Sequence, residues 1–208
     1  MTGPAGRELV VMRHGQAHNN LCGVIAAASC TGLTEAGRRA AAAAGARLRR
    51  GPSPAAVHAS PIRRARQTAE IVAAALDVPV RVEPELRAPD PGAAEGLRWA
   101  DVRARPQGLA GEPWSAYARR ATGCVRRLLA GGEPLVLVVG HTETVAAVFT
   151  LLVGDTGLGD LAVNVDYTAL TTFRSLTARQ HRQRWELVSY NDTDHVPAGL
   201  PRYPGHRR

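Results

Sequence analysis

Two short segments of the sequence place a histidine directly after an apolar run. In the segment VVMRHGQAH (10–18), the apolar run is followed by Arg13, His14 and Gly15. The segment VVGH ends at His141. The ends of strands in α/β proteins are where binding groups are presented, so the repeated design predicts that both histidines converge on one pocket. A neutral imidazole is a nucleophile at physiological pH, and a guanidinium fork matches phosphate oxygens. The residue types therefore favour chemistry on a ligand that carries phosphate.

A second arginine belongs to this hypothesis. Arg64 lies in SPIRRARQTA (60–69), near the start of an expected helix, where it can supply another guanidinium to a phosphate. The chain has 26 arginines and no lysine, so the abundance of arginine alone is not a functional signal. Two guanidiniums and a second imidazole balance the charge of a phosphoryl group, and no carboxylates have metal-binding spacing. We therefore expect no metal and no cofactor.

The elements that must position these residues alternate along the chain. Short β-branched runs are followed by alanine-rich segments with helical periodicity, which favours a parallel sheet covered by helices on both faces. The expected strands are 8–12, 55–60, 78–82 and 134–140, and the expected helices are 34–50, 61–76, 114–129 and 141–154. The sequence thus predicts a three-layer α/β sandwich in a single domain spanning 1–208.

Local signals refine this arrangement. Thr34 is a suitable helix cap, and Pro61 is expected in the first turn of its helix. Segments 167–174 and 184–190 alternate like strands joined by a polar turn, which predicts an antiparallel edge. The densest Gly and Pro lie in 86–113, interpreted as a loop region over the site.

Composition limits the class of partner. The formal net charge of +8 favours anionic ligands, but aromatic residues make up only 4%, which disfavours a nucleic-acid surface. Three cysteines without a CxxC spacing suggest neither zinc nor a disulfide framework. We see no signal peptide and no window of 18 apolar residues. We expect a cytoplasmic protein that acts on a phosphorylated small molecule, without nucleic acid or membrane; the sequence leaves the oligomeric state open.

Four motifs in order carry a family resemblance. RHGQAHNN, TGLTEAGRRAA, ASPIRRARQTAEIV and VVGHTETV resemble the histidine phosphatase superfamily, in its phosphoglycerate mutase-like branch. The resemblance implies that His14 is the nucleophile that takes the phosphoryl group. It also implies phosphate contacts for a further set of residues, namely Arg13, Arg64, His141 and Asn20, with Thr142 at a position where the family varies.

One position departs from the family. A segment like LREMDFGDWEG supplies the acid that protonates the leaving oxygen, and the corresponding segment here is LRAPDPGAAEG, with Ala88 at the acid position. The nearby carboxyl groups are Glu85, Asp90 and Glu95. If the segment is extended, side chains alternate with period two, so Asp90 points to the same side as position 88. Asp90 is therefore the first candidate for the proton donor, and Glu85 and Glu95 stay open as alternatives.

The sequence thus predicts a metal-independent phosphatase that hydrolyses a small-molecule phosphomonoester through a phosphohistidine on His14. Phosphoglycerate mutase-type phosphoryl transfer is the alternative closest in mechanism. A non-catalytic phosphate-binding module is a further alternative, because the usual acid position is Ala88. Specificity is expected in 86–113 and in 19–32, whose small apolar residues favour an organic alcohol portion.

Overall fold

The computed structural model describes residues 6–104, 109–153, 163–176 and 184–202. Within them, six strands form one sheet in the order β3-β2-β4-β1-β5-β6. No helix in these ranges combines the length and apolarity needed to cross a membrane. The strands are β1 (Glu8–Arg13), β2 (Val57–Ala59), β3 (Val80–Val82), β4 (Leu135–Gly140), β5 (Leu170–Leu176) and β6 (Arg184–Asp192).

The sheet is parallel through its first four members and antiparallel at one edge. β2 pairs in parallel with β3 and β4, and β4 pairs in parallel with β1. β5 runs antiparallel to both β1 and β6. The predicted mostly parallel sheet with an antiparallel edge is therefore confirmed. The expected 134–140 strand is observed as β4 (Leu135–Gly140), which lies centrally with every residue buried, whereas Pro134 precedes the strand and is exposed.

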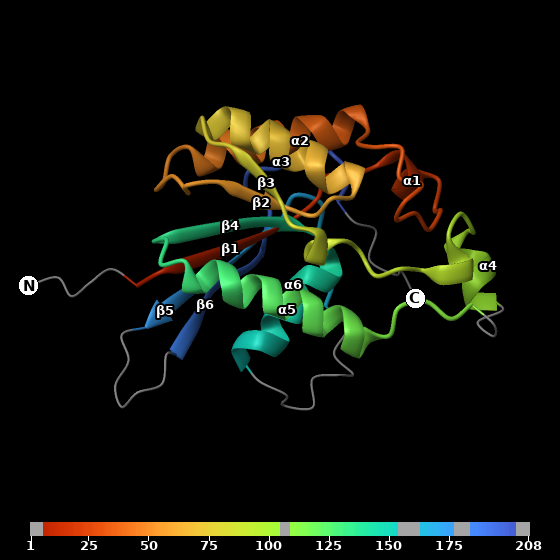
Figure 1. Cartoon of the computed structure of the whole chain (residues 1–208). Helices are drawn as coiled ribbons and strands as arrows, with labels where there is room; N and C mark the ends of the chain where they lie inside the picture. The colour runs from red at the N-terminus through yellow and green to blue at the C-terminus, as the bar shows by residue number, and fades with distance from the viewer. Residues whose placement is uncertain (1–5, 105–108, 154–162, 177–183, 203–208) are drawn as a thin grey trace, which may run out of the picture.

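Helices cover both faces of the sheet, as expected (Figure 1). One layer holds α2 (Glu35–Leu48) and α3 (Arg63–Leu76), and the opposite layer holds α5 (Trp114–Ala130) and α6 (Thr142–Val153). Two short helices, α1 (His18–Leu21) and α4 (Trp99–Ala104), lie together beyond one end of the sheet. One end of the sheet therefore faces the loops that carry α1 and α4.

The alternation of side chains in β1 builds two cores. Val10 and Met12 pack on one side with residues of α2 and α3, whereas Leu9 and Val11 pack on the other with residues of α5 and α6. Successive side chains of a strand point to opposite faces. Because both faces of the central strands are buried, their sequences are continuously apolar rather than alternating.

Thr34 caps α2 as predicted, because its side-chain oxygen accepts a hydrogen bond from the N–H of Gly37 at 3.0 Å. The expectation for Pro61 is wrong: α3 begins at Arg63 with Ile62 as its N-cap, so the proline precedes the helix. The expected end of α6 at Gly154 lies outside the described residues.

The 86–113 region is more structured than the expected loop. It begins at the end of a 3₁₀ turn at Pro84–Leu86, contains another at Gly92–Ala94, and carries α4. Its Gly and Pro density correctly indicated that the described parts of this region, 86–104 and 109–113, hold only short elements. It did not reveal these single turns, which are too short to show a period.

Candidate active site

The sheet register brings the two histidines together. Arg13, the last residue of β1, pairs with Gly140, the last residue of β4. His14 and His141 therefore leave neighbouring parallel strands side by side, and the His14 N–H donates to the Gly140 carbonyl at 2.9 Å. Their ring centroids lie 5.2 Å apart in an edge arrangement. The predicted convergence at the carboxyl ends of the strands is observed.

Two hydrogen bonds fix the tautomer of His14. Its Nδ1 lies 2.7 Å from the Gly15 carbonyl oxygen, which can only accept, so Nδ1 carries the proton. Its Nε2 lies 2.9 Å from Nε of Arg64, which can only donate, so Nε2 carries the lone pair. Both partners require the same tautomer. The lone pair is therefore at Nε2, beside a cationic group.

Arg64 joins the two histidines. It comes from the first turn of α3, and its Nη2 lies 3.4 Å from Nδ1 of His141. The opposite ring nitrogen of His141, Nε2, lies 2.8 Å from the hydroxyl of Ser60, the residue after β2. Ser60 has no counterpart among the sequence predictions; its place directly after a buried strand is the signal that could have indicated it.

Arg13 approaches from β1. Its Nη1 donates to the Val165 carbonyl, and its guanidinium carbon lies 4.5 Å from the centroid of the Tyr167 ring. The Tyr167 ring centroid is 6.2 Å from that of His14. Arg13 is therefore held by a carbonyl and an aromatic face next to the histidine pair.

Electrostatics keep both rings neutral. Burial, together with the neighbouring guanidiniums, holds the pKa of His14 and of His141 well below the ordinary value for histidine. For His14, burial is the largest cause, followed by Arg64, His141 and Arg13. The imidazole of His14 thus remains a neutral nucleophile at and somewhat below neutral pH, and the positive charge of the site resides on the arginines.

The glycine after His14 answers a steric requirement. A Cβ on Gly15 would lie 2.7 Å from the Gly37 carbonyl oxygen, and one on Gly37 would lie 2.2 Å from the Gln16 carbonyl oxygen. The loop after β1 and the start of α2 therefore pack backbone against backbone. The N–H of Gly15 also donates to the Thr68 hydroxyl on α3 at 3.0 Å. Three elements thus position the residue that follows His14.

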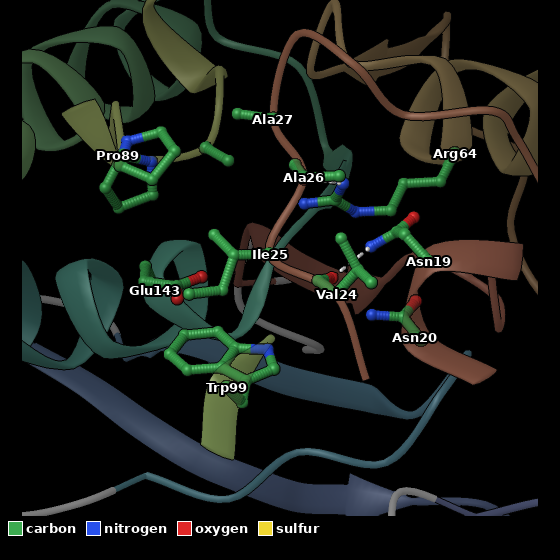
Figure 2. Close-up of a pocket in the computed structure, with 12 residues that line it drawn as sticks. Asn19, Asn20, Val24, Ile25, Ala26, Ala27, Arg64, Pro89, Trp99 and Glu143 are labelled. Atoms are coloured by element: carbon green, nitrogen blue, oxygen red, sulfur yellow. Dashed lines mark hydrogen bonds between the residues drawn. The ribbon is translucent and has the colours of Figure 1, made fainter. Parts of the chain in front are cut away.

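A cavity of about 220 Å³ borders the cluster of histidines and arginines, and Arg64 is the member of that cluster that lines it (Figure 2). Its apolar wall comes from both expected specificity segments, with Val24, Ile25 and Trp99 among its residues. Asn20 also lines it, while its side-chain oxygen accepts from the Ala17 N–H at 3.1 Å. Thr142 is half-buried at the start of α6 and is not among the residues that line the cavity.

The loop carboxyl groups have other partners. Asp90 is exposed, and its carboxylate accepts from the Gly92 N–H at 2.8 Å, so its side chain turns back on the loop. Ala88, in contrast, is buried and lines the cavity. Of these two residues only Ala88 lines the cavity, so the expectation that positions 88 and 90 point to the same side is wrong.

The other two loop carboxylates are likewise engaged. Glu95 accepts from the N–H groups of Ala27 and Ser29 at 3.0 and 2.8 Å, which stabilises the 19–32 segment. Glu85 pairs with Arg127 at 3.2 Å. Its oxygen belongs with those of Glu83 and the thiol of Cys124 to a group of possible metal ligands within 4.8 Å of one another. This group does not line the cavity at Arg64, and Arg127 also donates to Glu83 at 2.9 Å.

Residues 9–193 match the model of the histidine phosphatase superfamily, branch 1. The chain belongs to this superfamily. Its sequence is 26% identical over 210 residues to the metal-independent phosphoserine phosphatase of Arabidopsis thaliana, a match covering 91% of this chain and 83% of that protein. By family and relatives, this superfamily member is a phosphomonoesterase of the histidine phosphatase type.

Two mycobacterial proteins extend the comparison. The structure of mycobacterial glucosyl-3-phosphoglycerate phosphatase Rv2419c with VO3 has a TM-score of 0.79 and 27% identity, covering 89% of this chain and 99% of that chain. Bifunctional protein Rv2228c of Mycobacterium tuberculosis is 34% identical over 179 residues, 78% of this chain. The chain spans about half of the latter, at 49% of its length. The superfamily assignment therefore agrees between sequence and fold.

Proposed function

We propose that this phosphatase hydrolyses a small organic phosphomonoester without a metal ion, through a phosphohistidine on His14. The observation that carries the proposal is the fixed tautomer of His14. Gly15 holds the proton on Nδ1, which leaves the Nε2 lone pair available for attack on phosphorus. Similarity to a metal-independent phosphatase of phosphoserine supports the reaction class.

The surrounding charges suit the phosphoryl group. In the structure Arg64 donates to Nε2 of His14, so this hydrogen bond must pass to a phosphate oxygen before the nitrogen attacks. A guanidinium is well suited to that exchange, because it has several donors in a planar fork. Arg13 and His141 lie close enough to share the developing charge on the remaining oxygens. Asn20 and Thr142 remain proposed substrate contacts.

The substrate alcohol is expected to be organic and partly apolar. The cavity that opens from Arg64 is lined by Val24, Ile25, Ala26, Ala27, Pro89, Pro91 and Trp99, among others. Burial of apolar surface against such residues is favourable, and the polar lining residues Asn19, Asn20, Arg64 and Glu143 can meet polar groups of the alcohol. A phosphomonoester with one phosphate and an apolar or mixed alcohol portion fits this wall best.

The test is to trap the intermediate. The enzyme is incubated with ³²P-labelled phosphomonoester, quenched, and divided between acid and alkali. A phosphohistidine is lost in acid and retained in alkali, and peptide mapping is expected to place the label on His14. The His14→Ala variant should lose the label and about 10⁴-fold or more of kcat/KM, the scale seen when a covalent nucleophile is removed.

Metal independence is examined in the same assay. Prolonged treatment with EDTA should leave the rate unchanged, because two guanidiniums supply the charge that a metal would otherwise provide. Label on a serine, or a loss of rate in EDTA that magnesium restores, would contradict the mechanism. Unlabelled protein that still binds vanadate would favour the non-catalytic phosphate-binding module.

A further inference from the structure

The reaction needs a proton that the residues so far described do not supply. An alkoxide is a poor leaving group, and a positioned acid that protonates it typically contributes about 10²- to 10⁴-fold. Ala88 has no acidic group, and Asp90 points to solvent. We propose that the carboxyl group of Glu143 protonates the leaving oxygen. This inference rests on the proposed function and adds a catalytic residue to it.

Glu143 is placed where it can reach a substrate in the cavity. It lies in the first turn of α6, two residues after His141, and lines the same cavity as Arg64 and Ala88. In Figure 2 its carboxylate and the guanidinium of Arg64 both point inward, toward the region around Ile25. Since Arg64 also touches the nucleophilic nitrogen of His14, a phosphoryl group held there directs its alcohol portion into this cavity.

The carboxylate of Glu143 is available, unlike its competitors. Glu85 is paired with Arg127, Glu95 accepts from backbone N–H groups, and Asp90 accepts from Gly92. Within the described ranges, the carboxylate of Glu143 makes no ion pair and no hydrogen bond. A half-buried carboxyl group at a cavity wall can exchange a proton with a bound substrate without first breaking another contact.

The proton and the bonds balance over two steps. In the first, Nε2 of His14 forms a bond to phosphorus, the bond from phosphorus to the alcohol oxygen breaks, and the proton of the Glu143 carboxyl passes to that oxygen. In the second, the Glu143 carboxylate takes a proton from water as the water oxygen attacks phosphorus. The N–P bond breaks, inorganic phosphate leaves, and both residues return to their starting states.

The test compares leaving groups. Glu143→Gln preserves shape and removes the acid, so kcat/KM for an alkyl phosphate with an apolar alcohol portion, such as butyl phosphate, should fall about 10²-fold or more. For p-nitrophenyl phosphate, whose phenolate leaves without a proton, it should fall less than about fivefold. We compare kcat/KM because it reports steps up to phosphorylation of His14. Glu143→Asp retains the acid and should keep at least about tenfold more alkyl activity than Glu143→Gln.

Glu35→Gln is the matched control. Glu35 is also a first-turn helix glutamate, on α2, so its loss removes the same favourable charge from a helix N-terminus without touching the cavity. It should leave both substrates unaffected.

Several results would overturn the proposal. Glu143→Gln could lower kcat/KM equally for both substrates, or for neither. Asp90→Asn could instead lower kcat/KM selectively for the alkyl substrate. Glu143→Asp and Glu143→Gln could also be equally impaired. If the wild-type protein turned over neither substrate, the proposed function itself would fail, and this inference with it.

Discussion

The site has two parts that differ in how they are built: a buried group of basic residues, of which Arg64 lines the cavity, and a cavity wall made of loops. The phosphate wall, defined as Arg13, His14, Arg64 and His141, comes from strand ends and the first turn of α3, and each residue is at most 7% exposed. The loop wall, defined as Val24, Ile25, Pro89 and Trp99, comes from irregular segments, and Trp99 is 50% exposed. Under the proposed function, the strand ends and α3 would act on phosphorus, whereas the loops would recognise the alcohol.

This division has a physical basis. A phosphoryl group has one geometry in every monoester, so a rigid set of donors serves all substrates and loses little by being inflexible. Alcohols vary in size and polarity, and loops vary without disturbing a buried sheet. The predictions below test the difference between the walls in order of expected effect.

The largest effect is expected from Arg64→Ala. The variant removes the guanidinium that contacts both histidines, and loss of one charge-stabilising donor typically costs about 10²- to 10³-fold. Because phosphate is common to every substrate, kcat/KM should fall by a similar factor for alkyl and aryl phosphates alike. Steady-state kinetics on both classes measures this. A fall confined to one class would show that the walls are not separate.

The next effect concerns pH and stability. In the unfolded chain a histidine titrates near pH 6.5, whereas burial lowers the folded-state pKa of His14 and His141. Below pH 6.5 the unfolded chain therefore binds more protons, so the free energy of unfolding falls as pH falls toward the folded-state pKa values. Each histidine lowers the free energy of unfolding by about 1 kcal/mol for each pH unit of this range. Each kcal/mol lowers Tm by about 2–4 °C at this chain length.

Melting curves between pH 7.5 and 5.5 measure this slope. His14→Asn should reduce the slope of Tm against pH by the contribution of one histidine. Replacement of Trp99 in the loop wall should leave it unchanged, because no titratable group is altered. A slope that His14→Asn does not reduce would contradict the assignment of the neutral state to the phosphate wall.

The smallest effect is expected from Trp99→Ala. Since half of this side chain remains exposed, its loss should lower kcat/KM by about three- to tenfold, and only for substrates with a bulky apolar alcohol. Glycerol phosphate should be nearly unaffected. Trp114→Ala is the matched control, because Trp114 is 41% exposed on α5 and does not line the cavity. Equal losses on both alcohols would place Trp99 outside substrate recognition.

The fold could be predicted because its signals are local and redundant. Continuous apolar runs marked β1 and β4, and alanine-rich segments with a period near 3.6 marked α2 and α3. The unpredicted parts are single turns. α4 and the 3₁₀ turns follow from how 86–113 packs on the rest of the chain, which no short window of sequence contains.

The site divides in the same way. Arg13, His14 and His141 could be placed because parallel strands bring their carboxyl ends to one edge of the sheet. Asp90 could not be placed, since the period-two rule takes no account of local hydrogen bonds and its carboxylate accepts from the Gly92 N–H. Glu143 directly follows the predicted site residue Thr142, which does not line the cavity, so helical geometry rather than sequence distance decides that Glu143 does.

The contact between Gly15 and Gly37 has a consequence for thermal behaviour. Main-chain atoms pressed together have no rotamers to exchange, so the orientation of the residue beside them does not soften gradually as the temperature rises. The strand end can lose its position only when α2 leaves the sheet. We therefore expect the displacement of His14 on heating to coincide with unfolding of the α2 layer, whereas the loops around Trp99 can loosen at a lower temperature.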